Sequence, residues 1–209
     1  MPDPPTLLAG LTEIANRASA LAIAWHVVFA ALGVGLLLGL RPSHRALAVG
    51  LSALLASVAG CAVYFGNPFN ALVLGASALA LLAARMPPER ATLASGWARW
   101  LGALLLALGL WYPHFLRGSA LAYVYAAPLG TVPCPTLSAA IGIALLYDAK
   151  SSRTFCRLLA SVGVVYGLFG ALRLGVLIDL VLLTGALGLL AHTWPARRAH
   201  SSAARPARA

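Results

Sequence analysis

The chain has 209 residues, 61% of them hydrophobic and only 10% charged, which is too little polar surface to cover a water-soluble globule. Its formal charge of +10 does not indicate nucleic-acid binding, because the basic residues lie between apolar runs and at the C-terminus. Repeated apolar runs of about 20 residues, long enough to cross a bilayer, predict an all-α, polytopic integral membrane protein.

Seven transmembrane helices are predicted within a single domain that covers residues 1–195. The N-terminal segment carries Asp3 and Glu13 before any basic residue, so it is not interpreted as a cleaved signal peptide. Proline, glycine and charged residues separate the predicted spans. These spans are residues 19–40, 45–65, 69–85, 97–115, 119–147, 155–172 and 174–194. The remaining residues, 196–209, are rich in Ala, Ser and Arg and are expected to form a disordered, basic cytoplasmic tail.

The distribution of Lys and Arg predicts the orientation of these spans. With the N-terminus outside, 12 of the 15 basic residues lie on the inner side, and only Arg17, Arg117 and Arg173 lie outside. Such a bias is typical of the cytoplasmic side, so the C-terminus is expected inside, most simply at a bacterial cytoplasmic (inner) membrane. The count of seven depends on a tight turn near Arg173 and Gly175, because merging the last two spans would place the basic tail outside.

The sequence contains an internal similarity between positions that are 109 residues apart. This offset pairs residues 31–45 with 140–154, Gly66 with Gly175, and Asn70 with Asp179. It predicts parallel repeats at 19–85 and 119–194 joined by a linker helix at 97–115, although segments rich in Ala, Leu and Gly also align by chance. A three-plus-one-plus-three plan is similar to that of the sugar-transporting SWEET proteins, which also run from outside to inside. The similarity concerns organisation only and implies no substrate.

The fifth predicted span is interrupted by three prolines in Pro128-Leu129-Gly130-Thr131-Val132-Pro133-Cys134-Pro135-Thr136. Proline lacks the N–H that a helix needs, and broken backbone at membrane depth must be buried in protein or face water. We therefore expect two half-helices that meet near the bilayer middle, with Pro135 at the first position of the second. Cys134 would then lie at a helix N-terminus, which favours negative charge and makes it a candidate thiolate ligand or solute gate. The alternative is a proline kink in which Cys134 is a small packing residue.

The segment from Gly130 to Thr136, followed by an apolar helix, resembles the signature of an uncharacterised family of small prokaryotic polytopic membrane proteins. The resemblance covers residues 111–146. It implies a membrane fold, and since the family has no assigned activity it implies no substrate.

Several polar residues fall in the outer half of the predicted membrane domain, with Cys134 somewhat deeper. Ionisable residues within a membrane usually face the bundle interior or a water-filled cavity. For Asp179 the alternative is a structural hydrogen bond with Tyr166 or Thr184, and His26 also fits a hydrogen-bonded packing residue. Cys134, Cys61 and His26 together would suit copper(I), zinc or mercury(II), but they have no paired ligand spacing, and the sequence identifies no cofactor.

These features predict a small permease or carrier for a small solute or ion, with an outward-facing polar vestibule above the break. An alternative is a non-transporting integral membrane subunit or assembly factor. The expected partners are the lipid bilayer and either further copies or a larger membrane complex, and no nucleic acid. No catalytic signature is complete, although Cys134, His26 and Asp179 can be written as nucleophile, base and orienting acid. The candidate substrate or gate residues are Cys134, Pro133, Pro135, His26, Asp179, Asn70 and Tyr64.

Overall fold

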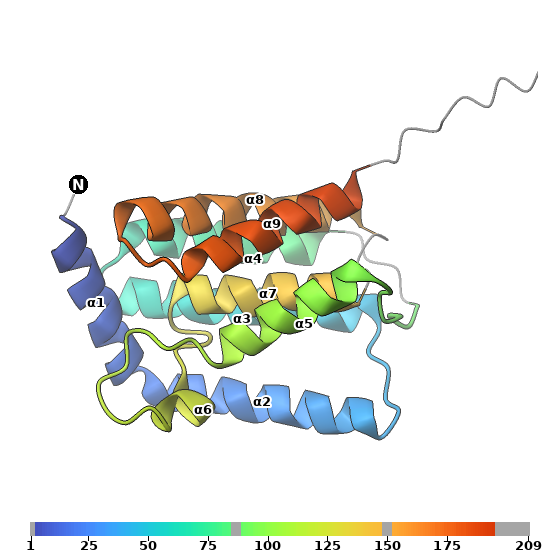
Figure 1. Cartoon of the computed structure of the whole chain (residues 1–209), viewed down its shortest axis with the longest axis horizontal. Coiled ribbons are helices and arrows are strands. Elements are labelled where there is room, and N and C mark those ends of the chain that lie inside the picture. The colour runs from blue at the N-terminus through green and yellow to red at the C-terminus, as the bar shows by residue number, and fades with distance from the viewer. Residues whose placement is uncertain (1–2, 85–88, 148–151, 195–209) are drawn as a thin grey trace, which may run out of the picture.

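The computed structural model describes residues 3–84, 89–147 and 152–194, and these residues form an all-helical protein (Figure 1). They contain nine α-helices and one π-helical turn, and no β-strand apart from an isolated bridge between Ser43 and Arg90. The predicted tail, residues 196–209, lies outside the described part of the chain.

Seven of the elements pack side by side with alternating direction, which matches the order of the seven predicted spans (Figure 1). We call the end where α1 lies the α1 end, and the opposite end, where α3, α5 and α8 begin, the basic end. The seven elements are α2 (Ser19–Leu37), α3 (His44–Tyr64), α4 (Pro68–Ala83), α5 (Trp97–Leu110), α7 (Pro133–Leu146), α8 (Arg153–Leu168) continued by the π-turn η2 (Phe169–Arg173), and α9 (Asp179–Thr193).

Three of these elements are long and apolar enough to cross a membrane: Ser19–Leu37, His44–Tyr64 and Arg153–Arg173. The other four are apolar but shorter, with 14 to 16 residues each. Two of them are shorter than predicted for local reasons. Helix α5 ends at Leu110 because Pro113 follows, and α9 begins only at Asp179 because Gly175, at φ +71°, makes the preceding turn.

Helix α7 is the centre of the bundle, and every residue from Pro133 to Leu145 is buried (Figure 1). Glycines let α5 approach it closely. A Cβ on Gly142 would lie 2.6 Å from the backbone nitrogen of Leu106, and one on Gly109 would lie 2.6 Å from the carbonyl oxygen of Pro135. Small residues are the usual means by which apolar helices bring their backbones together.

The predicted break in the fifth span is present, but its two sides are unequal. The first side is only the five-residue helix α6 (Ala122–Ala126), so the two half-helices expected at 119–147 are not formed. The second side begins at Pro133, two residues before the predicted Pro135. The extended backbone of Val132 ahead of Pro133 explains the earlier start, since a residue before proline disfavours helix.

Helix α1 (Pro4–Arg17) is an element that the sequence interpretation missed. It lies across the α1 end of the bundle (Figure 1). Its Asn16 side chain donates to the carbonyl oxygen of Phe115 at 2.8 Å and accepts from the N–H of Arg117 at 2.9 Å. These bonds fasten α1 to the loop that follows α5.

The proposed repeat has counterparts in the helix boundaries. Helices α3 and α8 begin 109 positions apart, and each has a serine N-cap, Ser43 or Ser152, that accepts from an N–H three residues on. Gly66 and Gly175 both have φ +71°. The first helices of the two triplets differ, because α7 is central whereas α2 lies at one side with Ala22 as its single buried residue. Superposition of the two triplets stays a prediction.

Candidate functional site

A cluster of polar side chains is buried near the α1 end. Asp179 accepts a hydrogen bond from the Tyr112 hydroxyl at 2.7 Å, and Asn70 accepts one from the Tyr166 hydroxyl at 2.8 Å. The Cys134 thiol lies close to the Asp179 carboxylate and to both tyrosines. We call these five residues the Asp179 cluster. It unites Asn70 and Asp179, which the repeat aligns, with Cys134 of the proline motif.

Five separate elements position the cluster. Asn70 is in the first turn of α4, Tyr112 follows α5, Cys134 is the second residue of α7, Tyr166 is in α8, and Asp179 begins α9. Packing around the acid is tight, because a Cβ on Gly170 would overlap the Asp179 carboxylate. A larger residue than glycine at position 170 would therefore displace Asp179.

The carboxyl group of Asp179 is buried without a basic partner. The residue is only 1% exposed, and its neighbours in the described structure are a phenol and a thiol. The only ion pair within the described residues joins Arg17 to Glu13, on α1. Burying a carboxylate without a cation is costly, so an acid in this position suits the uptake and release of a proton or cation.

The backbone of the proline motif is satisfied by protein groups. The N–H of Gly130 donates to the Thr136 hydroxyl at 2.9 Å, which in turn donates to the carbonyl oxygen of Val132 at 2.7 Å. Two prolines near the start of α7 also remove two N–H groups that would otherwise need partners. These bonds stabilise the turn that leads into α7 and places Cys134 beside Asp179 of α9.

Helix α2 contacts the same motif through Trp25. The Trp25 indole donates to the Ser57 hydroxyl at 3.0 Å, and Ser57 donates to the carbonyl oxygen of Gly130 at 2.7 Å. Gly130 has φ +73°, and a Cβ there would collide with the Trp25 ring. Only glycine fits this position, which explains the glycine of the motif.

The cluster is covered at the α1 end. The ring of Phe115 stacks on that of Tyr112, with centroids 6.0 Å apart and planes within 5°. Phe115 has φ +76°, a backbone conformation that residues other than glycine rarely adopt. Its carbonyl oxygen accepts a hydrogen bond from the Asn16 side chain of α1. Cys134 is only 7% exposed. In the described structure the thiol thus lacks the water access that a reactive thiolate needs, and the polar vestibule stays a prediction.

Three predicted site residues lie outside the cluster. Tyr64 is 77% exposed at the end of α3, with its ring against that of Phe65. Both ring nitrogens of His26 lie near backbone carbonyl oxygens, those of Ala22 at 2.8 Å and Leu110 at 3.0 Å, as expected of a packing residue. Cys61 is buried in α3.

The described residues contain no group of three or more His, Cys, Asp or Glu side chains that could hold a metal ion. Cys134, Cys61 and His26 are accordingly not brought together as a soft-metal site. Cys134, His26 and Asp179 also do not form a catalytic triad in this structure. The ring nitrogens of His26 lie against backbone carbonyl oxygens rather than against Cys134 or Asp179.

Two tyrosines of the cluster were not among the predicted site residues. Tyr166 was considered as a partner of Asp179 but bonds to Asn70 instead, and Thr184, the other considered partner, bonds to the Leu180 carbonyl oxygen. Tyr112 was not singled out as a site residue from the sequence, yet it is fully buried. Nothing in the local sequence around Tyr112 distinguishes it from the exposed Trp111 beside it.

Comparisons with protein-family models, curated proteins and solved structures find no match to this chain. The resemblance of the proline motif to an uncharacterised family stays a prediction.

Proposed function

We propose that this chain is an integral membrane protein whose seven packed elements cross a bilayer, with the α1 end outside. Three long apolar helices and their alternating directions support this arrangement. Helix α2 also exposes large apolar side chains along its length, including Val27, Val28 and Leu37, which in water would be a large unfavourable surface. The arginines Arg41, Arg45, Arg90, Arg99, Arg153 and Arg157 gather at the basic end, as expected of a cytoplasmic side.

We further propose that the protein is a small carrier, in which Asp179 takes up and releases a proton or cation that moves alone or with a small solute. The single observation that supports this role is the burial of Asp179 beside Tyr112 and Cys134 without a basic partner among the described residues. If Asp179 had only a structural role, the protein would be more stable with an amide at this position or with a cation beside the carboxylate. A residue that takes up and releases a proton or cation must instead be able to change its charge. The Tyr112 hydroxyl contacts the acid, and its oxygen atom would replace water around an incoming cation.

The two sides of the cluster suggest where alternating access would occur. Toward the α1 end, Phe115 covers Tyr112. Toward the basic end, Ser138 lies one helical turn beyond Cys134, and its buried hydroxyl has no hydrogen-bond partner in the described structure. Ile141 then packs against Gly163 of α8. We assign Phe115 as the outer closure and Ile141 as the inner one.

Uptake into liposomes tests the carrier proposal. Purified protein would be reconstituted with a pH-sensitive dye inside the vesicles and exposed to proton, sodium, potassium and divalent-cation gradients, with and without sugars and amino acids. Asp179→Asn should abolish a flux that the unmodified protein supports, because the amide cannot take up a proton or pair with a cation. Asp3→Asn, a change at an exposed acid, should leave the flux unchanged.

Absence of any flux above that of protein-free vesicles, with correctly folded protein, would contradict the proposal. The chain would then fit the alternative of a non-transporting membrane subunit, with Asp179 serving to join α5 to α9. Flux that Asp179→Asn leaves unchanged would keep the carrier but remove the acid from its mechanism.

A further inference from the structure

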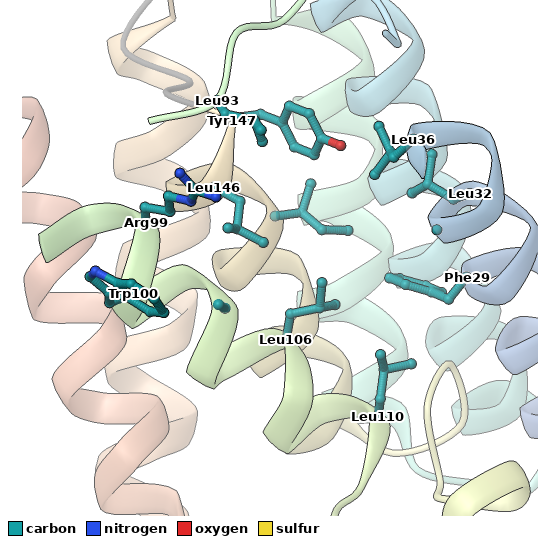
Figure 2. A pocket seen from close by; sticks show the side chains of 13 residues that line it. Phe29, Leu32, Leu36, Leu93, Arg99, Trp100, Leu106, Leu110, Leu146 and Tyr147 are labelled. Atoms are coloured by element: carbon teal, nitrogen blue, oxygen red, sulfur yellow. The ribbon is translucent and has the colours of Figure 1, made fainter. Parts of the chain in front are cut away.

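An apolar cleft of about 440 Å³ separates α2 from α5, and α7 forms its floor (Figure 2). Its walls include Phe29, Leu32 and Leu36 of α2, and Leu106 and Leu110 of α5. The cleft is separate from the Asp179 cluster, since none of the five cluster residues lines it. Its volume is within the range of ordinary ligand sites.

The cleft is polar at one end only. Arg99, Leu146 and Tyr147 lie at the basic end, whereas Phe29, Leu106 and Leu110 lie farther along it toward the α1 end (Figure 2). Tyr147 is only 2% exposed, and its hydroxyl has no hydrogen-bond partner within the described structure. The hydroxyl points across the cleft toward Leu36 (Figure 2). An unsatisfied buried hydroxyl is uncommon, and this one belongs to a residue that lines the cleft.

Positive charge accompanies the unsatisfied hydroxyl. Arg99 lines the cleft, and Arg41 follows α2 at the same end of the bundle. Within the described residues, no acidic side chain lines the cleft. The polar end therefore fits an anion that accepts hydrogen bonds, such as a phosphate group.

The length of the cleft fits one leaflet of a bilayer. Arg99 and Leu110 are 11 helical positions apart, which at the rise of an α-helix is roughly 16 Å. The hydrocarbon of one leaflet is about 15 Å thick. A chain that begins beside Arg99 and runs along α5 would thus reach the bilayer middle.

We propose that this cleft binds one anionic phospholipid of the inner leaflet. One acyl chain lies between α2 and α5, and the phosphate accepts hydrogen bonds from Arg99 and the Tyr147 hydroxyl. The inference rests on the membrane placement proposed above but not on transport. It gives the loosely packed α2 a ligand that joins it to the rest of the bundle.

Binding to the full-length protein in a neutral detergent tests this inference. Native mass spectrometry and thermal unfolding would be followed during titration with a phosphatidylglycerol and with a phosphatidylcholine of identical chains. We expect one phosphatidylglycerol to bind at least about tenfold more tightly than the phosphatidylcholine and to raise the unfolding temperature. Arg99→Gln and Tyr147→Phe should each remove most of that preference, while Arg157→Gln, at an exposed arginine of the same end, should not.

A second pair of variants tests the chain site without altering charge. Gly33 lines the cleft, and a Cβ there meets nothing within 4 Å, so Gly33→Leu should fold yet occupy the space of the acyl chain. It should weaken phosphatidylglycerol binding, whereas Gly60→Leu, which has equal free space on α3, should not.

Three outcomes would overturn the inference. Equal binding of both lipids, unaffected by the variants, would mean non-specific lipid contact. Equal stabilisation by inorganic phosphate alone would mean an anion site without a chain. Dimers whose formation excludes lipid would make the cleft an interface between two copies. The transport proposal is tested separately, because Asp179→Asn should leave lipid binding intact.

Discussion

Asp179 and Tyr112 lie 67 positions apart in the chain and meet through a 2.7 Å hydrogen bond. Cys134 lies beside this pair, and Asn70 accepts a second buried hydrogen bond from Tyr166 at 2.8 Å. Buried polar groups need such partners, because an unmet hydrogen bond costs about 1–3 kcal/mol. The hydrogen bonds of this cluster therefore stabilise the fold and also hold the Asp179 carboxyl group in place.

Tyr112→Phe should destabilise the protein. It removes the hydroxyl that donates to Asp179 and leaves a buried carboxyl group with one partner fewer, which we expect to cost roughly 1–3 kcal/mol. Thermal unfolding in detergent would measure the loss. The matched change Tyr64→Phe, at an exposed tyrosine, should have almost no effect. Equal stability of the two variants would mean that the buried bond contributes nothing.

Cys134 should be protected from thiol reagents until the outer closure is removed. In a variant whose only thiol is Cys134, made with Cys61→Ala and Cys156→Ala, an impermeant maleimide added outside should react slowly and then completely after denaturation. Phe115→Ala should speed labelling by at least about tenfold, because it removes the ring that covers Tyr112.

Leu116→Ala is the control for that experiment, since it shortens the neighbouring side chain without opening the ring stack. Fast labelling of Cys134 in the unmodified protein would show an open vestibule in solution. Slow labelling that Phe115→Ala does not change would remove Phe115 from the role of outer closure.

Helices α5 and α7 pack more closely than large side chains would permit. Three glycines, Gly102, Gly109 and Gly142, lie where any Cβ would meet backbone of the other helix at 2.6–2.8 Å. Helix α8 approaches α9 in the same way, because a Cβ on Gly167 would lie 2.9 Å from the Leu183 nitrogen. Contact distances thus depend on small residues in both pairs, as is common where helices associate without a polar surface.

Gly142→Ala should destabilise the bundle by about 1–3 kcal/mol, because the new methyl group would overlap the α5 backbone and force the helices apart. Gly60→Ala should be neutral or slightly stabilising, because its Cβ meets nothing within 4 Å and alanine favours helix. Thermal unfolding of both variants, side by side, provides the measurement. Equal unfolding temperatures would show that the interface adapts without cost.

Over the whole molecule, arginines and apolar surface are arranged as a membrane-spanning bundle requires. The described arginines of the connectors that are proposed to be cytoplasmic gather at the basic end, and α1 lies across the other end. Helix α1 pairs Glu13 with Arg17 on its exposed side and buries Ile14 and Ala15, which suits a helix that rests at a membrane surface.

A reporter fused after Arg198 should be cytoplasmic, because 12 of the 15 basic residues would lie on that side. A second reporter inserted after Gly118, in the loop that follows α5, should be outside. Enzyme-fusion activity in intact bacterial cells would read both positions. An outside signal from the Arg198 fusion would contradict the seven-span arrangement, whatever the transport result.

The sequence by itself determined that the chain is helical and gave most boundaries of the seven packed elements, although it missed α1. That all seven cross a membrane stays a prediction. The signals for these boundaries are local: the length of an apolar run, a proline that stops a helix, and a glycine that permits a turn. The break before α7 was predictable for the same reason, since three prolines in nine residues exclude a regular helix. Asp179, Asn70 and Cys134 were recognisable because polar residues are rare in such runs.

Only the tertiary structure decided which helix is central and which polar groups meet. The seven elements are apolar on nearly all sides, so their sequences carry no polar face that shows which way a side chain points. Tyr64 was therefore selected as a candidate site residue and Tyr112 and Tyr166 were not, although Tyr64 is exposed and the other two are buried. The hydrogen-bond partners of Asp179, its burial and the stacking of Phe115 on Tyr112 all depend on segments far apart in the chain. Such contacts exist only once the bundle has packed.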